Sequence, residues 1–246
     1  MTTFVTSIVH LYEKEPYEHK NIEWRISHFK KIAETGIPIV VYYDNTTFSV
    51  FEQLFPLFRN IHFFFFDYKK TSIYKECIRD DLELPICKNE KKDTKEYMGL
   101  MNTKIEFVRD AIKKNVWKTD HFAWFDFSMA YLFHTPTDSL EKIKNFQKIP
   151  EGKRFLCIPG CWNRPSNVQC LLNVIHWRFC GSFFIGDKET LLQFYDAYLS
   201  HFSRFLNDHK KIVWEVNVWA WLENENLINP TWYNADHNDR IIDAPM

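Results

Sequence analysis

The most informative feature of the chain is a single carboxylate, Asp126, in an apolar stretch that is suited to a buried strand. The stretch runs from His121 to Ala130 and is typical of a buried strand, because central parallel strands are hydrophobic on both faces. A buried charge needs a partner or a metal, so Asp126 is more cheaply placed at the strand's carboxyl end. Ligands bind at that edge of open α/β sheets, and an acid there can hold a divalent ion that grips phosphates. The alternative is a carboxylate that caps the next turn.

Acids follow two other predicted strands. Asp44 comes directly after the apolar run 38–43, and Asp67 comes directly after the run 61–66. The carboxyl ends of parallel strands meet at one edge of a sheet, so we expect these two acids and Asp126 to line one rim. The alternative is that Asp is a good turn residue, which explains one or two of the three more comfortably than all of them.

Polar side chains also interrupt the second half of the chain. Glu215 and Asn217 lie inside the apolar segment 214–222, and buried polar groups are either networked or functional. His237 lies in a polar cluster at 233–238. Such a cluster is typical of a turn, but it can also return an imidazole to the rim of acids as a metal ligand.

Strands and helices alternate along the chain, which predicts an α/β fold with a mostly parallel central sheet and helices on both faces. A glycine inside the last predicted strand, Gly181, marks a bulge or a close backbone approach to a ligand. Gly36 is a plausible stop for the first helix, and Pro159-Gly160 stops another strand. The predicted strands cover 4–9, 38–43, 61–66, the run before Asp126, 154–158 and 179–186, and the predicted helices cover 22–33, 50–58, 97–112 and 191–206.

The length and composition favour one domain over residues 1–246. Hydrophobic residues make up 46% of the chain, which supplies a sizeable core. The segment at about 68–96 is long and charged, which predicts a functional loop, a small insertion or a mobile segment. We therefore expect a single domain that carries a charged insertion.

Charge and motifs exclude several classes of protein. The formal net charge of −1 gives no global field for nucleic acid or an anionic membrane surface. No apolar run is long enough to span a membrane, and the first residues lack the basic region of a signal peptide, so we expect a cytoplasmic protein. The six cysteines have no zinc-site spacing, and neither a dinucleotide-binding glycine motif nor a P-loop is present.

The order of these motifs resembles that of the bacterial HtrL/YibB family, which has relatives in large DNA viruses, and more distantly that of GT-A glycosyltransferases. The similarity covers most of the chain outside the 68–96 segment. The most specific motif is the Trp-Phe-Asp of residues 124–126, and the others support it mainly by their order. The segments that carry the resemblance are 3–7, Asn102-Thr103-Lys104, 122–128, 181–187, 215–220 and Asp236-His237.

The resemblance implies a metal site. In GT-A enzymes an Asp-x-Asp motif after a central strand holds Mn²⁺ or Mg²⁺ on the donor diphosphate. Asp126 matches the first position of that motif, whereas Ser128 stands at the second, and a hydroxyl is a weaker ligand for a hard cation than a carboxylate. His237 fits the place of a C-terminal metal ligand. Lys104 would meet the diphosphate as a point charge, its alternative being a solvated helix face.

The resemblance also implies residues for the nucleotide and the sugar. Thr6, Ser7 and Asp44 would face the base and ribose of the donor. Glu215 lies where such enzymes place an acidic or amide group near the reacting sugar. The remaining residues that we assign to the site are Asn217 as a second catalytic residue and Trp124 and Gly181 in donor binding.

The predicted function is transfer of a sugar from a nucleotide-diphosphate sugar, most simply a UDP-sugar, to a glycan or other hydroxyl acceptor. Two alternatives stay open. One is a catalytically inactive GT-A-like domain that binds a carbohydrate or a partner, which the serine at position 128 supports. The other is a metal-dependent phosphohydrolase, because strand-end carboxylates also suit that chemistry.

Overall fold

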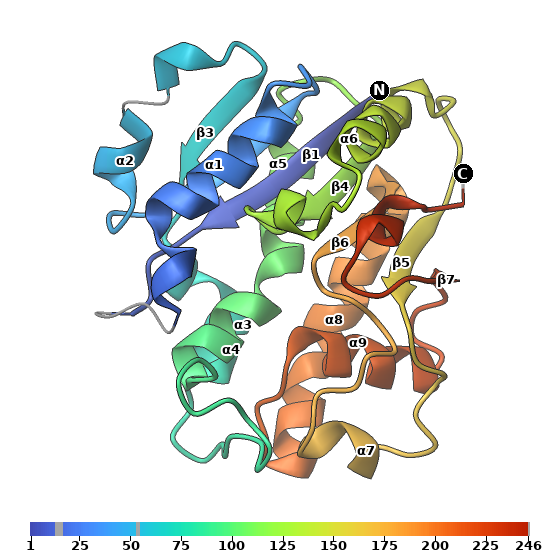
Figure 1. Ribbon diagram of the computed structural model, residues 1–246. Coiled ribbons are helices and arrows are strands. Elements are labelled where there is room, and N and C mark those ends of the chain that lie inside the picture. Colours follow the sequence, from blue (N-terminus) through green and yellow to red (C-terminus); the bar gives the residue numbers. More distant parts are fainter. Residues whose placement is uncertain (13–16, 53–54, 246) are drawn as a thin grey trace.

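Alternating strands and helices build one mixed sheet with helices on both of its faces (Figure 1). The computed structural model describes residues 1–12, 17–52 and 55–245. The strands are β1 (Thr2–Ile8), β2 (Ile39–Tyr43), β3 (Ile61–Phe65), β4 (His121–Phe125), β5 (Leu156–Gly160), β6 (Phe183–Asp187) and β7 (Thr231–Asn234). The α-helices are α1 (Ile22–Ala33), α2 (Phe48–Glu52), α3 (Ser72–Cys77), α4 (Lys95–Asn102), α5 (Lys104–Lys114), α6 (Pro136–Asn145), α7 (Gln169–Leu172), α8 (Lys188–His209) and α9 (Glu215–Asn224).

The seven strands lie in the order β3-β2-β1-β4-β6-β5-β7. The first four are parallel neighbours, with Val5 beside Val40 on one side and beside Trp124 on the other. β6 runs antiparallel to β4 and β5, and β7 returns parallel to β5. The predicted α/β fold with a mostly parallel sheet is therefore confirmed. Because β1 pairs with β2 on one edge and β4 on the other, the strand order turns at β1.

Successive strand residues point to opposite faces, so the sheet separates two hydrophobic cores. Phe122 and Trp124 pack into one core with α5 and α8, whereas Ala123 and Phe125 pack into the other with α1 and α6. All four side chains are at most 2% exposed. Helices on both faces explain why β4 is apolar from Phe122 to Phe125 and is followed by a carboxylate just past its end.

Three sequence predictions differ from the structure. The helix predicted over 97–112 is two helices, because the Thr103 N–H and hydroxyl bond back to the carbonyls of α4 and end it before α5 begins. Gly181 precedes β6 rather than lying inside it. Pro159 and Gly160 are the last two residues of β5 rather than a stop after Ile158. The helix predicted over 50–58 falls partly on residues 53–54, outside the described residues.

The charged segment 68–96 is folded onto the core. It contains α3, whose Ile73 and Cys77 are fully buried. The Glu106 carboxylate of α5 accepts hydrogen bonds from the backbone N–H groups of Ser72 and Ile73, at the amino end of α3. The segment therefore joins the sheet to the later helices. Within the described residues, no helix combines the length and apolarity that a membrane crossing requires.

Candidate functional site

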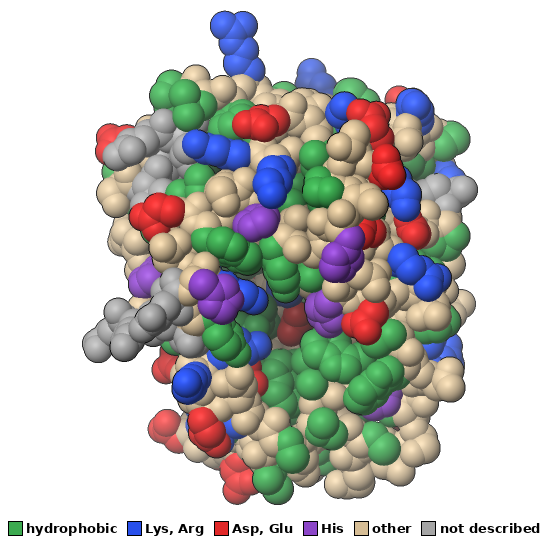
Figure 2. Space-filling view, in the orientation of Figure 1, with side chains coloured by type: hydrophobic (Ala, Val, Ile, Leu, Met, Phe, Trp, Pro, Cys, Tyr) green, Lys and Arg blue, Asp and Glu red, His purple; other side chains and the backbone are tan. Residues whose placement is uncertain are grey.

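A pocket of about 390 Å³ opens at the carboxyl ends of β1 and β4. Ser7 at the end of β1, Trp124 at the end of β4 and Asp126 just beyond it line the pocket, together with Ser128 and Ser182. Figure 2 shows the molecule hollowed near the centre of the face it displays. This volume lies within the range of small-molecule sites. The position is the turning point of the strand order, where open α/β sheets bind ligands.

Asp126 is the carboxylate that faces this pocket, and its side chain is 39% exposed. Its Oδ1 accepts hydrogen bonds from the Trp124 indole N–H at 3.0 Å and pairs with the Lys104 ammonium at 2.9 Å. The Asp126 backbone N–H donates to the Ser182 carbonyl at 2.9 Å. Two contacts therefore fix the carboxylate and a third fixes the backbone of Asp126, while Oδ2 has no hydrogen bond within the described part of the chain.

Lys104 lies beneath the pocket as the first residue of α5 and is 2% exposed. Its Nζ contacts Glu215 Oε1 at 2.8 Å and the Gly181 carbonyl at 2.9 Å, besides Asp126. Burial alone would lower the pKa of Lys104, but the two carboxylates outweigh it and raise that pKa above its ordinary value. The ammonium thus stays charged, and one cation serves two carboxylates.

Gly181 is required because Glu215 packs directly against it. A β-carbon at Gly181 would lie 2.2 Å from Glu215 Oε1, which is far inside van der Waals contact. Glu215 is 5% exposed and its Oε1 is committed to Lys104. Glu215 therefore holds Lys104 in place from behind the pocket, and it is absent from the residues that line it.

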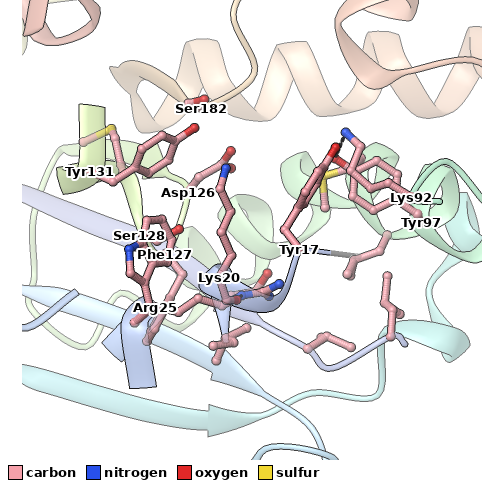
Figure 3. A pocket seen from close by; sticks show the side chains of 18 of the residues that line it. Tyr17, Lys20, Arg25, Lys92, Tyr97, Asp126, Phe127, Ser128, Tyr131 and Ser182 are labelled. Carbon is pink, nitrogen blue, oxygen red and sulfur yellow. Dashed lines mark hydrogen bonds between the residues drawn. The ribbon is translucent and has the colours of Figure 1, made fainter. Parts of the chain in front are cut away.

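Basic side chains that the sequence predictions did not include form another wall of the pocket. Lys20 and Arg25 come from the start of α1 and the turn before it, and Lys92 comes from the charged segment 68–96. Figure 3 shows the three side chains reaching toward the pocket from different elements. Burial lowers the pKa of Lys20. The nearby positive charges of Lys92 and Arg25 lower that pKa further, because like charges repel.

Aromatic rings surround the Lys20 ammonium. Its Nζ lies 4.8 Å from the ring centroid of Tyr131, 5.5 Å from that of Tyr17 and 5.7 Å from that of Trp24. Such faces attract a cation through the ring quadrupole. Tyr17, Lys20 and Trp24 lie within eight residues of one another, whereas Tyr131 comes from the turn after β4 and is brought to them by the fold.

Asp44, Thr6 and Asn217 are also absent from the pocket lining. Asp44 is buried and accepts hydrogen bonds from the Thr46 N–H and hydroxyl, so it caps a turn. Thr6 is fully buried within β1, and its hydroxyl has no partner among the described residues. Asn217 is fully buried, its amide donating to the carbonyls of Leu171 and Val174.

His237 lies on the surface beside Asp236. Its Nδ1 is 3.1 Å from Asp236 Oδ1, and its ring packs edge-on against Trp177, with centroids 4.6 Å apart. It does not line the pocket. Asp67 likewise lies outside the lining and pairs with Lys70 in an exposed ion pair. Of the predicted rim of acids, the structure brings Asp126 alone to the pocket.

The residues of the pocket fit the predicted Mn²⁺ or Mg²⁺ poorly. No group of three His, Cys, Asp or Glu side chains suited to a metal occurs among the described residues. One Asp126 oxygen is already paired with an ammonium, and Ser128 offers a neutral hydroxyl as the next protein oxygen of the motif. Lys104 at 2.9 Å from Asp126 would also repel a divalent ion held by the same carboxylate.

The mostly parallel sheet, with a pocket where the strand order turns, defines an α/β protein with a pocket at the topological switch point. The chain belongs to the HtrL/YibB family, since residues 47–234, more than half of its length, match the family described as "Bacterial protein of unknown function (HtrL_YibB)". The family resemblance seen in the sequence is confirmed. A search of curated proteins returned no match.

Two solved structures are similar to the chain. One is 4-diphosphocytidyl-2C-methyl-D-erythritol synthase from Anaerococcus prevotii, at 8% identity and a TM-score of 0.47, covering 96% of this chain and 88% of that one. The other is mouse xyloside xylosyltransferase 1 in its apo form, at 10% identity and a TM-score of 0.47, covering 94% and 84%. At this distance neither tells which substrate the pocket takes.

Proposed function

We propose that the protein is a glycosyltransferase that uses a nucleotide-diphosphate sugar, with a UDP-sugar as the first candidate donor. The observation that carries this proposal is a fixed, half-exposed carboxylate, Asp126, on the floor of a pocket at the switch point of the sheet. Basic side chains line another wall of the same pocket, so one ligand can meet an acid and several cations. A phosphorylated sugar has hydroxyl groups that can bind the acid and phosphate groups that can bind the cations.

The residues would take distinct roles in transfer. Asp126 is placed to accept a hydrogen bond from a hydroxyl of the donor or the acceptor through its open Oδ2. In an inverting reaction the same carboxylate would take the proton of the attacking hydroxyl while the sugar leaves the diphosphate. Lys104 and Glu215 would act as positioning residues, since both are buried behind Asp126.

The two alternatives have weaker support. A metal-dependent phosphohydrolase needs a set of metal-binding side chains, and no such group occurs among the described residues. An inactive domain that only binds carbohydrate keeps the support of Ser128. Turnover separates that domain from an enzyme.

The test compares two acids that both follow a strand of the parallel part of the sheet. Asp126→Asn removes the charge in the pocket, whereas Asp67→Asn removes an exposed charge outside it. We would measure UDP-sugar binding by a thermal-shift panel and by calorimetry, and transfer by release of UDP with candidate acceptors. A ligand at 100 times its Kd raises the free energy of unfolding by about 2.7 kcal/mol.

We expect at least one nucleotide sugar to stabilise the wild-type protein and Asp67→Asn, and UDP release to fall at least about 100-fold in Asp126→Asn. Absence of binding by any nucleotide or nucleotide sugar would contradict the proposal. Binding with no turnover across a broad acceptor panel would favour the inactive domain. Equal turnover in the two variants would show that the Asp126 carboxylate takes no part in the reaction.

A further inference from the structure

The pocket holds its carboxylate on the floor and most of its positive charges on another wall, which the resemblance to an Asp-x-Asp motif does not predict. On its floor one lysine, Lys104, is shared between two carboxylates. On another wall Lys20, Arg25 and Lys92 bring positive charge together. A pocket that concentrates cations on one wall attracts an anion there.

Lys20 is the member of that wall with the most open ammonium. Its charged group contacts three aromatic rings, and no carboxylate of the described residues pairs with it. Figure 3 shows the side chain extended from the turn before α1 into the pocket, on the side of Asp126. Rings hold the lysine stem in place yet leave the three N–H donors without strong acceptors. Such a group is prepared to bind an incoming oxyanion.

Lys92 is a second lysine of the same wall, and its ammonium is held by neighbouring side chains. Its Nζ donates to the Tyr97 hydroxyl at 3.1 Å and lies 3.3 Å from Asp93 Oδ1, so it is anchored at the pocket edge. Its mutual repulsion with Lys20 is relieved when an anion binds between them. This relief favours a group with two negative charges over a neutral ligand.

A divalent cation has a less favourable position in the same pocket. Among the described residues that line the pocket, Asp126 is the one carboxylate, and one of its two oxygens is paired with Lys104. A metal on the other oxygen would lie close to the Lys104 ammonium, and its hydration shell would have to be replaced by few protein oxygens. The lysines supply the charge that a metal would otherwise bring to a diphosphate.

We propose that Lys20 and Lys92 form the diphosphate-binding wall of this pocket, and that the nucleotide diphosphate binds there without a divalent cation. The inference rests on the proposed function for the identity of the ligand, but it concerns how the phosphates are held. Asp126 is then left free for a hydroxyl group rather than for a metal.

The experiment measures UDP and inorganic pyrophosphate binding to the full chain by calorimetry, in EDTA and in MnCl₂. The informative variant is Lys20→Gln, because among the described residues that ammonium has no carboxylate partner whose loss would disturb the fold. Its control is Lys31→Gln, which removes an exposed lysine of α1 that does not line the pocket. Lys92→Gln is a second variant, read together with its Tm, because it leaves the buried Asp93 without its cation.

We expect UDP to bind in EDTA with an affinity within a few-fold of that in MnCl₂. Lys20→Gln should weaken UDP and pyrophosphate about tenfold or more, as for loss of a charge-assisted hydrogen bond, with Tm and uridine binding unchanged. Lys31→Gln should bind as the wild type does. UDP binding that requires Mn²⁺, or an unchanged affinity in Lys20→Gln, would overturn the inference while leaving the glycosyltransferase proposal intact. Failure of every nucleotide to bind would overturn both.

Discussion

Replacing Lys104 by Met tests the buried charge cluster beneath the pocket. The change keeps most of the aliphatic stem but removes the ammonium that contacts Glu215 at 2.8 Å, Asp126 at 2.9 Å and the Gly181 carbonyl at 2.9 Å. Because Glu215 is 5% exposed, its carboxylate is left without a cation in a poorly hydrated site. Removing one partner of a buried ion pair costs about 3–5 kcal/mol. We expect Lys104→Met to lose that much of its free energy of unfolding.

The assay is urea denaturation at pH 7. Because the pKa of Lys104 is raised, its stabilising charge is fully present below the unfolded value of about 10.4 and is lost only as pH rises through the folded pKa. Neutral pH therefore measures the charged form. Lys142→Met is the control, since its pair with Asp243 is exposed and should contribute about 1 kcal/mol or less.

A double variant sharpens the test. Adding Glu215→Gln to Lys104→Met removes the stranded charge, so the two changes together should cost less than the sum of each alone, by about 1–3 kcal/mol. Additive costs, or a loss below about 1 kcal/mol in Lys104→Met, would refute the reasoning that one buried cation stabilises two carboxylates.

Three further predictions concern the buried side chains of Asn217 and Asp187 and the cysteine thiols. Asn217→Ala should lower the free energy of unfolding by about 2 kcal/mol or more by denaturation, because the amide satisfies backbone groups in a fully buried site. Asp187→Ala should cost about 1–2 kcal/mol at pH 7 through loss of the α8 N-cap. Hydrogen bonds to its carboxylate outweigh burial and lower its pKa, so this cost should fade in acid, below about pH 4. In a thiol-labelling assay Cys87 should react first, whereas burial raises the pKa of Cys157 to about 11 and should protect it.

Each of these three predictions would be contradicted by a specific result. Wild-type stability of Asn217→Ala would mean that its amide bonds contribute nothing to the fold. A cost for Asp187→Ala that grows as pH falls would contradict the direction of its pKa. Labelling of Cys157 as fast as Cys87 would show that β5 opens readily in the native state.

The sequence predicted the sheet and the position of Asp126 because those features are local. An apolar run with an acid at its end reports burial followed by an exposed edge, and the parallel order of β1, β2, β3 and β4 follows from the alternation with helices. The break at Thr103 was missed because apolar spacing continues across it, while the hydrogen bonds that end α4 are short-range and leave that spacing intact.

The basic wall could not be predicted because its members are brought together by tertiary structure. Lys20 and Lys92 lie 72 positions apart in charged or unpatterned segments, and each alone resembles a solvated surface lysine. The same reasoning explains why Asn217 was assigned to catalysis. A polar residue in an apolar helix indicates that partners exist, but the partners are backbone groups of α7 and the turn after it.

The position of β1 also has a consequence for how the chain folds. This strand is made before β2 and β4, yet those two strands close its edges, so residues 2–5 must wait for residues 121–124 before the sheet is continuous. Parallel pairing over such a separation is slow, because the chain loses the entropy of loop closure before the stabilising contacts between the strands form. A nascent chain that ends before β4 therefore exposes an unpaired apolar strand edge, and variants that weaken the β1–β4 pairing should aggregate during synthesis before they lose stability in the folded state.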